Sequence, residues 1–106
     1  MEQENKMNQK VIIKAIKTYG REAQMRQCIE EMAELTQAIC KHFRITDKEN
    51  VDVKEFKENY ASLVDETADV YIMIQQMIHM IGAEDIIERV NFKIDRLEKR
   101  LEEKNE

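Results

Sequence analysis

The chain has no proline, no tryptophan and only two glycines, Gly20 and Gly82, among its 106 residues. Proline and glycine are the residues that most often interrupt a helix, so their scarcity favours long helices over strands and tight turns. The length fits a single domain that covers residues 1–106. Because so small a domain buries only roughly 60–70% of the surface of its unfolded chain, we expect homo-oligomerisation to supply further core.

The sequence also lacks long apolar runs and basic clusters. Its longest apolar-rich stretch, residues 70–81, is interrupted by Gln75, Gln76 and His79, whereas a membrane-spanning helix needs about 20 apolar residues. The opening segment MEQENKMNQK has no apolar core of the kind that a signal peptide carries. The excess of acidic over basic residues, 22 against 17, disfavours nucleic-acid polymers and anionic membranes as partners. We therefore expect a cytoplasmic protein that binds neither.

The two cysteines, Cys28 and Cys40, fall in the same predicted helix. Twelve residues at about 1.5 Å each separate them by roughly 18 Å, which exceeds the reach of a disulfide bond. Both have apolar neighbours, so we expect buried free thiols in a reducing compartment. A bridge between two chains is the alternative.

Apolar residues recur at steps of three and four in four segments, which predicts an all-α fold, a compact bundle of about four helices. The expected helices cover about 8–19, 21–44, 54–81 and 84–101. The polar segment 45–53 is expected to form a loop, and residues 1–7 and 102–106 are expected to fray. A coiled-coil dimer through the third and fourth helices is the alternative arrangement.

The apolar stripes of the two long helices are expected to face inward. On the second helix the stripe consists of Met25, Cys28, Met32, Leu35, Ile39 and Phe43. On the third helix it consists of Tyr60, Leu63, Val70, Ile74, Met77 and Ile81. Each stripe is flanked by an acidic edge. If the helices pack antiparallel through their apolar faces, the two acidic edges meet.

The acidic edges contain two short motifs, IEEMAELTQ and DETADVYIM. Glu31 and Glu34 are three residues apart, as are Glu66 and Asp69, so each pair shares one face of its helix. Four converging carboxylates repel one another unless a cation neutralises them. Mg²⁺ is suited to this task because it prefers oxygen ligands. The alternative is a solvated acidic face, but Leu35, Ala38, Val70 and Met73 stand where helical cation partners would be.

With these two motifs and their apolar flanks, the sequence resembles the all-α nucleotide pyrophosphohydrolases of the MazG-like superfamily from about residue 15 to residue 101. The signature of that family is Glu-Glu-x-x-Glu on one helix and Glu-x-x-Asp on the next. The resemblance implies a hydrolase that cleaves nucleoside triphosphates between the α and β phosphates and releases monophosphate and pyrophosphate. Its expected task is housekeeping of the nucleotide pool.

The resemblance also implies roles for individual residues. The Mg²⁺ ligands would be Glu31, Glu34, Glu66 and Asp69, and Mn²⁺ is a candidate substitute for the metal. Glu30 would assist Glu31 and Glu34 in catalysis, through a second metal or by orienting water. This chain departs from compact members of the family in the longer gap between Glu34 and Glu66, which contains the 45–53 loop. Whether the 45–53 loop contacts the substrate stays open, as do the base and sugar that the enzyme would prefer.

Basic residues of the last predicted helix are candidates for binding phosphate. Lys93, Arg96 and Arg100 recur at steps of three and four, and family members use Lys and Arg at comparable places. Lys93 and Arg96 are the stronger candidates, whereas Arg100 fits a solvated face paired with acidic neighbours. Asn91 is a candidate contact to the base or sugar. No role is assigned to His42 or His79.

Two rival functions stay open. Phosphoribosyl-ATP pyrophosphohydrolases of histidine biosynthesis use a related motif, so their substrate is one alternative. The other is a helical interaction module that has the fold but no catalysis. The expected assembly is a homodimer or a homotetramer, and the sequence does not distinguish the two.

Overall fold

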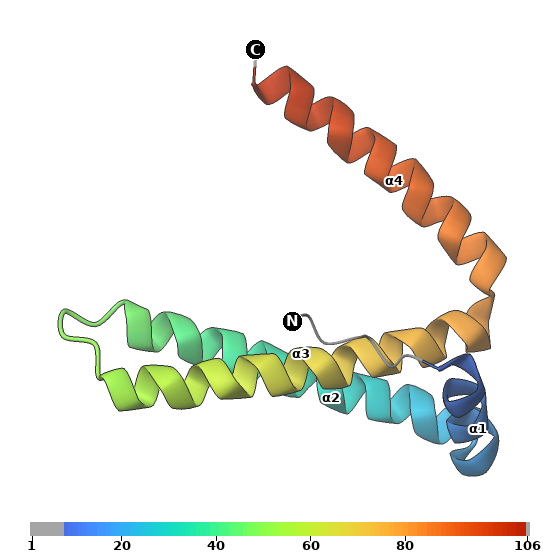
Figure 1. Cartoon of the computed structure of the whole chain (residues 1–106), viewed down its shortest axis with the longest axis horizontal. Coiled ribbons are helices and arrows are strands. Elements are labelled where there is room, and N and C mark those ends of the chain that lie inside the picture. The colour runs from blue at the N-terminus through green and yellow to red at the C-terminus, as the bar shows by residue number, and fades with distance from the viewer. Residues whose placement is uncertain (1–7, 106) are drawn as a thin grey trace.

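The computed structural model describes residues 8–105 of the chain, and these form four α-helices without a strand. The helices are α1 (Gln9–Tyr19), α2 (Arg21–Thr46), α3 (Val53–Ile81) and α4 (Ala83–Lys104) (Figure 1). The predicted all-α class and the number of helices are confirmed. Residues 102–106 were expected to fray, and this is wrong for residues 102–104, because they belong to α4, which ends at Lys104. Residues 1–7 and 106, also expected to fray, lie outside the described residues.

Local sequence explains where the helices begin and end. The side chains of Asn8 and Asp52 cap α1 and α3 by accepting hydrogen bonds from backbone N–H groups of the first turn. Gly20 and Gly82 are the single residues that separate α1 from α2 and α3 from α4, and both have positive φ angles, 95° and 147°. Glycine adopts such angles without the steric cost of a Cβ atom. Each glycine therefore allows an abrupt change of direction between two helices.

The predicted 45–53 loop is shorter in the structure. Ile45 belongs to the last turn of α2 and is only 1% exposed, and Val53 already begins α3. The connection is reduced to residues 47–52. Burial of the Ile45 side chain extends the helix beyond the point where the polar sequence suggested its end.

Helices α2 and α3 form a long antiparallel hairpin, and α1 packs across the end that contains the start of α2 and the end of α3 (Figure 1). Two buried side-chain hydrogen bonds link α2 and α3, in addition to an exposed one from Arg21 Nη1 to the backbone oxygen of Met80. Gln24 Nε2 donates to Gln76 Oε1 over 2.6 Å, and Asn59 Nδ2 donates to the backbone oxygen of Ala38 over 3.1 Å. These buried bonds set which residues of α2 lie opposite which residues of α3.

The prediction that the most apolar stripes face inward is wrong in part. The buried residues of the hairpin are Gln24, Cys28, Ala38, Ile45, Asn59, Met73 and Gln76. In contrast, Met32, Ile39 and Phe43 are 42–57% exposed. The contact between α2 and α3 is therefore formed mainly by the edges that were expected to flank the apolar stripe of each helix. Periodicity locates the stripes of a helix, but it does not state which neighbour covers each of them.

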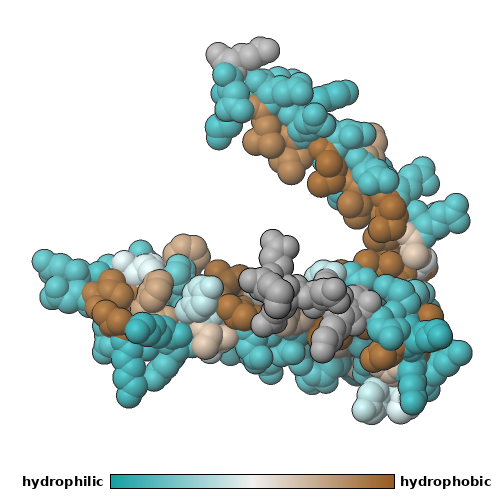
Figure 2. Space-filling model, in the orientation of Figure 1, coloured by the Kyte–Doolittle hydropathy of each residue, from teal (hydrophilic) through white to brown (hydrophobic). Residues whose placement is uncertain are grey.

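Helix α4 stands away from the hairpin (Figure 1) and contains no buried residue. Among the described helices it contacts only α3. Its apolar stripe, drawn as the brown band along this helix in Figure 2, is 45–55% exposed and consists of Ile87, Val90, Ile94, Leu97 and Leu101. The radius of gyration is 17.7 Å, against about 13 Å for a compact domain of 100 residues. The expected bundle is thus formed by α1, α2 and α3, with α4 apart from it.

No helix within residues 8–105 combines the length and the apolar character that crossing a membrane requires.

Candidate metal site between α2 and α3

The hairpin brings the predicted carboxylates together from both helices. One group contains Glu31, Glu34 and Glu66, each of which offers an oxygen atom within 4.8 Å of the others. A second group contains Asp65, Glu66 and Asp69 within the same limit. Glu66 belongs to both, so it lies at the centre of a carboxylate cluster, which we define as these five residues.

Two oxygen atoms of the carboxylate cluster are buried without a hydrogen-bond partner among the described residues. They are Glu31 Oε2 and Glu66 Oε2. The other oxygen of Glu31, Oε1, accepts a hydrogen bond of 2.7 Å from Gln27 Nε2. A buried acceptor that loses water and gains no donor costs roughly 1–3 kcal/mol. The cluster therefore contains groups that a ligand would stabilise.

The electrostatic surroundings raise the pKa of two of these carboxyl groups. Desolvation is the largest cause for Glu66, followed by repulsion from Glu34 and then from Asp69 and Glu31. The pKa of Asp69 is also raised, first by desolvation and then by the charge of Glu31. The pairs that repel across the hairpin, Glu34 with Glu66 and Glu31 with Asp69, indicate that negative charge is concentrated between the two helices.

The chemistry of the donors fits a hard divalent cation. Both groups consist of carboxylates alone, and oxygen ligands are those that Mg²⁺ and Mn²⁺ prefer. A cation held there would satisfy the buried oxygens of Glu31 and Glu66 and neutralise the repulsion between the helices. The four residues predicted as ligands are divided between the two groups: Glu31, Glu34 and Glu66 belong to the first, and Glu66 and Asp69 to the second.

Two differences from the predicted site concern neighbouring acids. Glu30 is exposed and belongs to neither group, so its side chain lies outside the carboxylate cluster. Asp65 belongs to the second group, although it was not predicted as a ligand. Its position four residues before Asp69 places both on one helical face, and this spacing was the signal that could have identified it.

The predicted phosphate-binding residues are not beside the carboxylates within one chain. Lys93, Arg96 and Asn91 are exposed on α4, which makes no contact with α2. Arg96 instead lies 6.0 Å from the ring centroid of Phe92 on its own helix. The basic residues that do lie near the cluster are on α2, at the other end of a cavity that Glu34 and Glu66 help to line.

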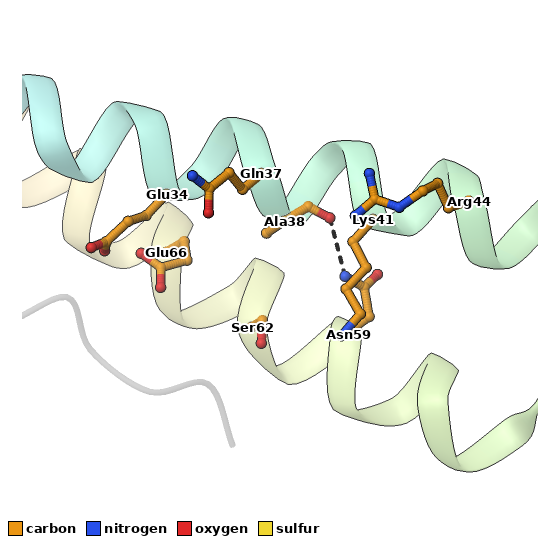
Figure 3. A pocket seen from close by; sticks show the side chains of 8 residues that line it. All are labelled: Glu34, Gln37, Ala38, Lys41, Arg44, Asn59, Ser62 and Glu66. Atoms are coloured by element: carbon orange, nitrogen blue, oxygen red, sulfur yellow. Dashed lines mark hydrogen bonds between the residues drawn. The ribbon is translucent and has the colours of Figure 1, made fainter.

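That cavity has a volume of about 290 Å³ and lies along the hairpin (Figure 3). Its walls on α2 include Lys41 and Arg44, and its wall on α3 includes Asn59 and Ser62. None of these four residues was predicted from the sequence to be functional. Lys41 is seven residues beyond Glu34 and so shares its face of α2. The cavity exists only where α3 packs against α2, so the sequence pattern of one helix carried no signal for it.

The histidines and cysteines lie outside the carboxylate cluster. His42 packs near the rings of Phe43 and Phe56, and His79 is hydrogen-bonded to Gln9 of α1. Both cysteines are free thiols. Cys28 is buried, as expected, but Cys40 is exposed, so the prediction of a buried Cys40 thiol is wrong.

Comparison of the chain with protein-family models, with curated proteins and with solved structures finds no match.

Proposed function

We propose that the chain is a Mg²⁺-dependent nucleotide pyrophosphohydrolase. Its substrates would be (deoxy)nucleoside triphosphates, cleaved between the α and β phosphates to give monophosphate and pyrophosphate. The observation that carries the proposal is the carboxylate cluster, with its buried and unpaired oxygens of Glu31 and Glu66. Acidic side chains arranged in this way favour a metal-assisted reaction on an anionic substrate.

The acidic residues in and beside the cluster would have two different roles, holding the cation and orienting water. Glu31, Glu34, Glu66 and Asp69 would hold the cation, with Mn²⁺ as a substitute for Mg²⁺. When bound, the cation would neutralise phosphate charge and lower the pKa of an attacking water. Glu30, which is exposed beside the cluster, is our candidate for orienting that water.

We also propose that the chain works as a homo-oligomer. The support is the apolar stripe of α4, which no other described helix covers, together with the exposed apolar residues Met32, Ile39 and Phe43 of α2. Contiguous exposed apolar surface is typical of a protein interface. Assembly with a second copy would also offer a route by which Lys93 and Arg96 reach a carboxylate cluster, which they do not do within one chain.

The same exposed surface is the observation that favours a second function, a helical interaction module without catalysis. Such a module would need the apolar faces but not the carboxylate cluster. Metal dependence therefore separates the two functions.

The enzymatic proposal is tested by incubating the protein with a panel of ribonucleoside and deoxyribonucleoside triphosphates and Mg²⁺ while pyrophosphate is measured. We expect pyrophosphate from at least one of them. Glu34→Gln and Asp69→Asn should each abolish turnover and leave the helical circular dichroism spectrum unchanged. The matched control is Glu88→Gln, which removes an exposed carboxylate of α4 and should not affect turnover. Absence of pyrophosphate with every triphosphate, with both Mg²⁺ and Mn²⁺, would contradict the proposal.

A further inference from the structure

The cavity along the hairpin changes from acidic to basic along its length. Glu34 and Glu66 line one end, and Lys41 and Arg44 line the other (Figure 3). At 1.5 Å per residue along α2, Lys41 is about 10 Å beyond Glu34. A nucleotide whose phosphates lie at the carboxylate cluster would therefore extend its sugar and base toward the two basic residues.

The two basic side chains offer hydrogen-bond donors and no acceptor. Neither Lys41 nor Arg44 takes part in the ion pairs of the described part of the chain. The macrodipole of α2 favours cations near its C-terminal end, which accounts for Arg44 in the last turn. It does not account for the direction of Lys41, whose side chain extends from α2 toward α3 across the cavity in Figure 3. An acceptor group of a ligand fits this end of the cavity.

Asn59 offers the opposite function, a single hydrogen-bond acceptor. This residue is 2% exposed and lines the same cavity. Its Nδ2 donates to the backbone oxygen of Ala38, which fixes the orientation of the amide because a carbonyl oxygen cannot donate. The remaining atom, Oδ1, is buried and has no donor among the described residues. An N–H group of a ligand in the cavity would satisfy it.

The edges of the nucleic-acid bases differ in how well they complement this set of groups. Uracil, thymine, hypoxanthine and guanine present a ring N–H beside a carbonyl oxygen, and that oxygen has two lone pairs. One N–H then meets the one acceptor, and the carbonyl accepts from both cations. Cytosine and adenine present an amino group beside an unprotonated ring nitrogen, which gives two N–H donors and one lone pair. One of those donors would lack an acceptor, and one cation would lack a partner.

We propose that the cavity selects nucleotides whose base presents a ring N–H beside a carbonyl group, and that Asn59 is the residue that reads the N–H. This inference rests on the proposed function, because it places the triphosphate at the carboxylate cluster. The N–H donates to Asn59 Oδ1, and the neighbouring carbonyl accepts from Lys41 and Arg44. A site built to bind a ligand N–H rejects an analogue that lacks it, because the buried acceptor is then left unpaired.

The experiment uses two pairs of ligands that differ only at this edge of the base, inosine against adenosine and uridine against cytidine. Binding of their α,β-imido triphosphates, which resist cleavage between the α and β phosphates, is measured by calorimetry with Mg²⁺. In each pair that binds, we expect the carbonyl base to bind more tightly by about tenfold or more, the range of one unmatched hydrogen bond. Turnover of the four parent triphosphates is measured separately by pyrophosphate release.

Variants assign the preference to the residues that line the cavity. Lys41→Met/Arg44→Met changes two exposed side chains, so it should fold, and it should lose most of the preference. Asn59→Leu should lose the preference as well, with circular dichroism as the check on its fold. The matched control is Lys57→Met, which removes an exposed cation of α3 that does not line the cavity, and it should keep the preference.

Three results would overturn the inference. The first is equal or inverted affinity within the pairs that bind, and the second is no binding of any of the four analogues. The third is a Lys41→Met/Arg44→Met variant that weakens all four by the same factor, since the two cations would then serve the triphosphate. A preference for carbonyl bases without any pyrophosphate would support base selection and contradict only the enzymatic function. Pyrophosphate from all four triphosphates, without a preference in binding, would contradict only base selection.

Discussion

Gln24 of α2 and Gln76 of α3 form a buried hydrogen bond of 2.6 Å across the hairpin. The two residues are 8% and 3% exposed. An amide pair of this kind tolerates only a register in which both members meet. With Gln24 opposite Gln76, the antiparallel course brings Glu31 opposite Asp69 and Glu34 opposite Glu66, the pairs between which repulsion raises the pKa values. The amide pair and the carboxylate cluster are thus two results of one register.

Breaking the amide pair should destabilise the hairpin. We expect Gln24→Ala to lower the free energy of unfolding by about 1–3 kcal/mol, because Gln76 keeps a buried amide without its partner. The double variant Gln24→Leu/Gln76→Leu should recover part of the loss, since neither polar group is left unpaired. Urea denaturation at one protein concentration measures both effects. Gln37→Ala, at an exposed position of α2, should change the free energy by no more than about 0.5 kcal/mol. A double variant as unstable as the sum of the two single Leu variants would argue against coupling.

Mg²⁺ should raise the melting temperature of the wild type. A ligand that binds only the folded state at one hundred times its dissociation constant stabilises by about 2.7 kcal/mol. Glu66→Gln should remove most of this shift, because Glu66 belongs to both groups of the carboxylate cluster. Thermal denaturation with and without EDTA measures the shift, and Glu88→Gln should behave as the wild type does. A wild type that is indifferent to Mg²⁺ and Mn²⁺ would favour the interaction module.

Without metal, the stability should rise as the pH falls from neutrality toward the raised pKa values of Glu66 and Asp69. A carboxyl group whose pKa is higher in the folded state binds more protons there than in the unfolded chain, so folding is favoured as protons are added. The gain ends below the ordinary carboxyl pKa of about 4, where both states are protonated. Urea denaturation in EDTA at several pH values measures the slope. Glu66→Gln removes one titrating group and should flatten the slope relative to the wild type. Parallel slopes for the two proteins would contradict the raised pKa of Glu66.

The two thiols should differ in reactivity. Cys28 is 2% exposed and desolvation raises the pKa of its thiol, whereas Cys40 is exposed. Because the thiolate is the reactive form, a thiol reagent should modify Cys40 quickly. It should modify Cys28 only when the hairpin opens. Mass spectrometry after timed labelling identifies the residue, and Cys40→Ser should abolish the fast phase. Equal labelling rates in the native protein would show that the hairpin does not protect Cys28.

The apolar stripe of α4 should mediate self-association. We expect the double variant Ile94→Ser/Leu97→Ser to shift the protein toward monomer, because these two residues are about half exposed within one chain and their burial in an interface would be lost. Sedimentation velocity over a range of concentrations measures the association. The control Asp95→Ser/Lys99→Ser changes the polar side of the same helix and should leave the assembly intact. A wild type that sediments as a monomer at every concentration would contradict the proposed assembly.

Local patterns accounted for the helices of this chain. The spacing of apolar residues, the absence of proline and the positions of Gly20 and Gly82 predicted four helices, and the structure has them within a few residues. The largest difference is at Ile45, where tertiary burial lengthened α2 beyond the polar signal. The spacing of Glu31, Glu34, Glu66 and Asp69 was also visible in the sequence, because residues three apart must share a helical face.

The tertiary structure decided which faces meet. A helical wheel ranks stripes by apolar content, and it ranked the stripe with Met32, Ile39 and Phe43 above the stripe that α3 covers. The buried contact between the helices depends instead on pairs far apart in sequence, such as Gln24 with Gln76 and Ala38 with Asn59. Those pairs convert two separate acidic edges into one carboxylate cluster and place Lys41 and Arg44 along the same cavity. Periodicity describes one helix at a time, whereas a site shared by two helices exists only in their register.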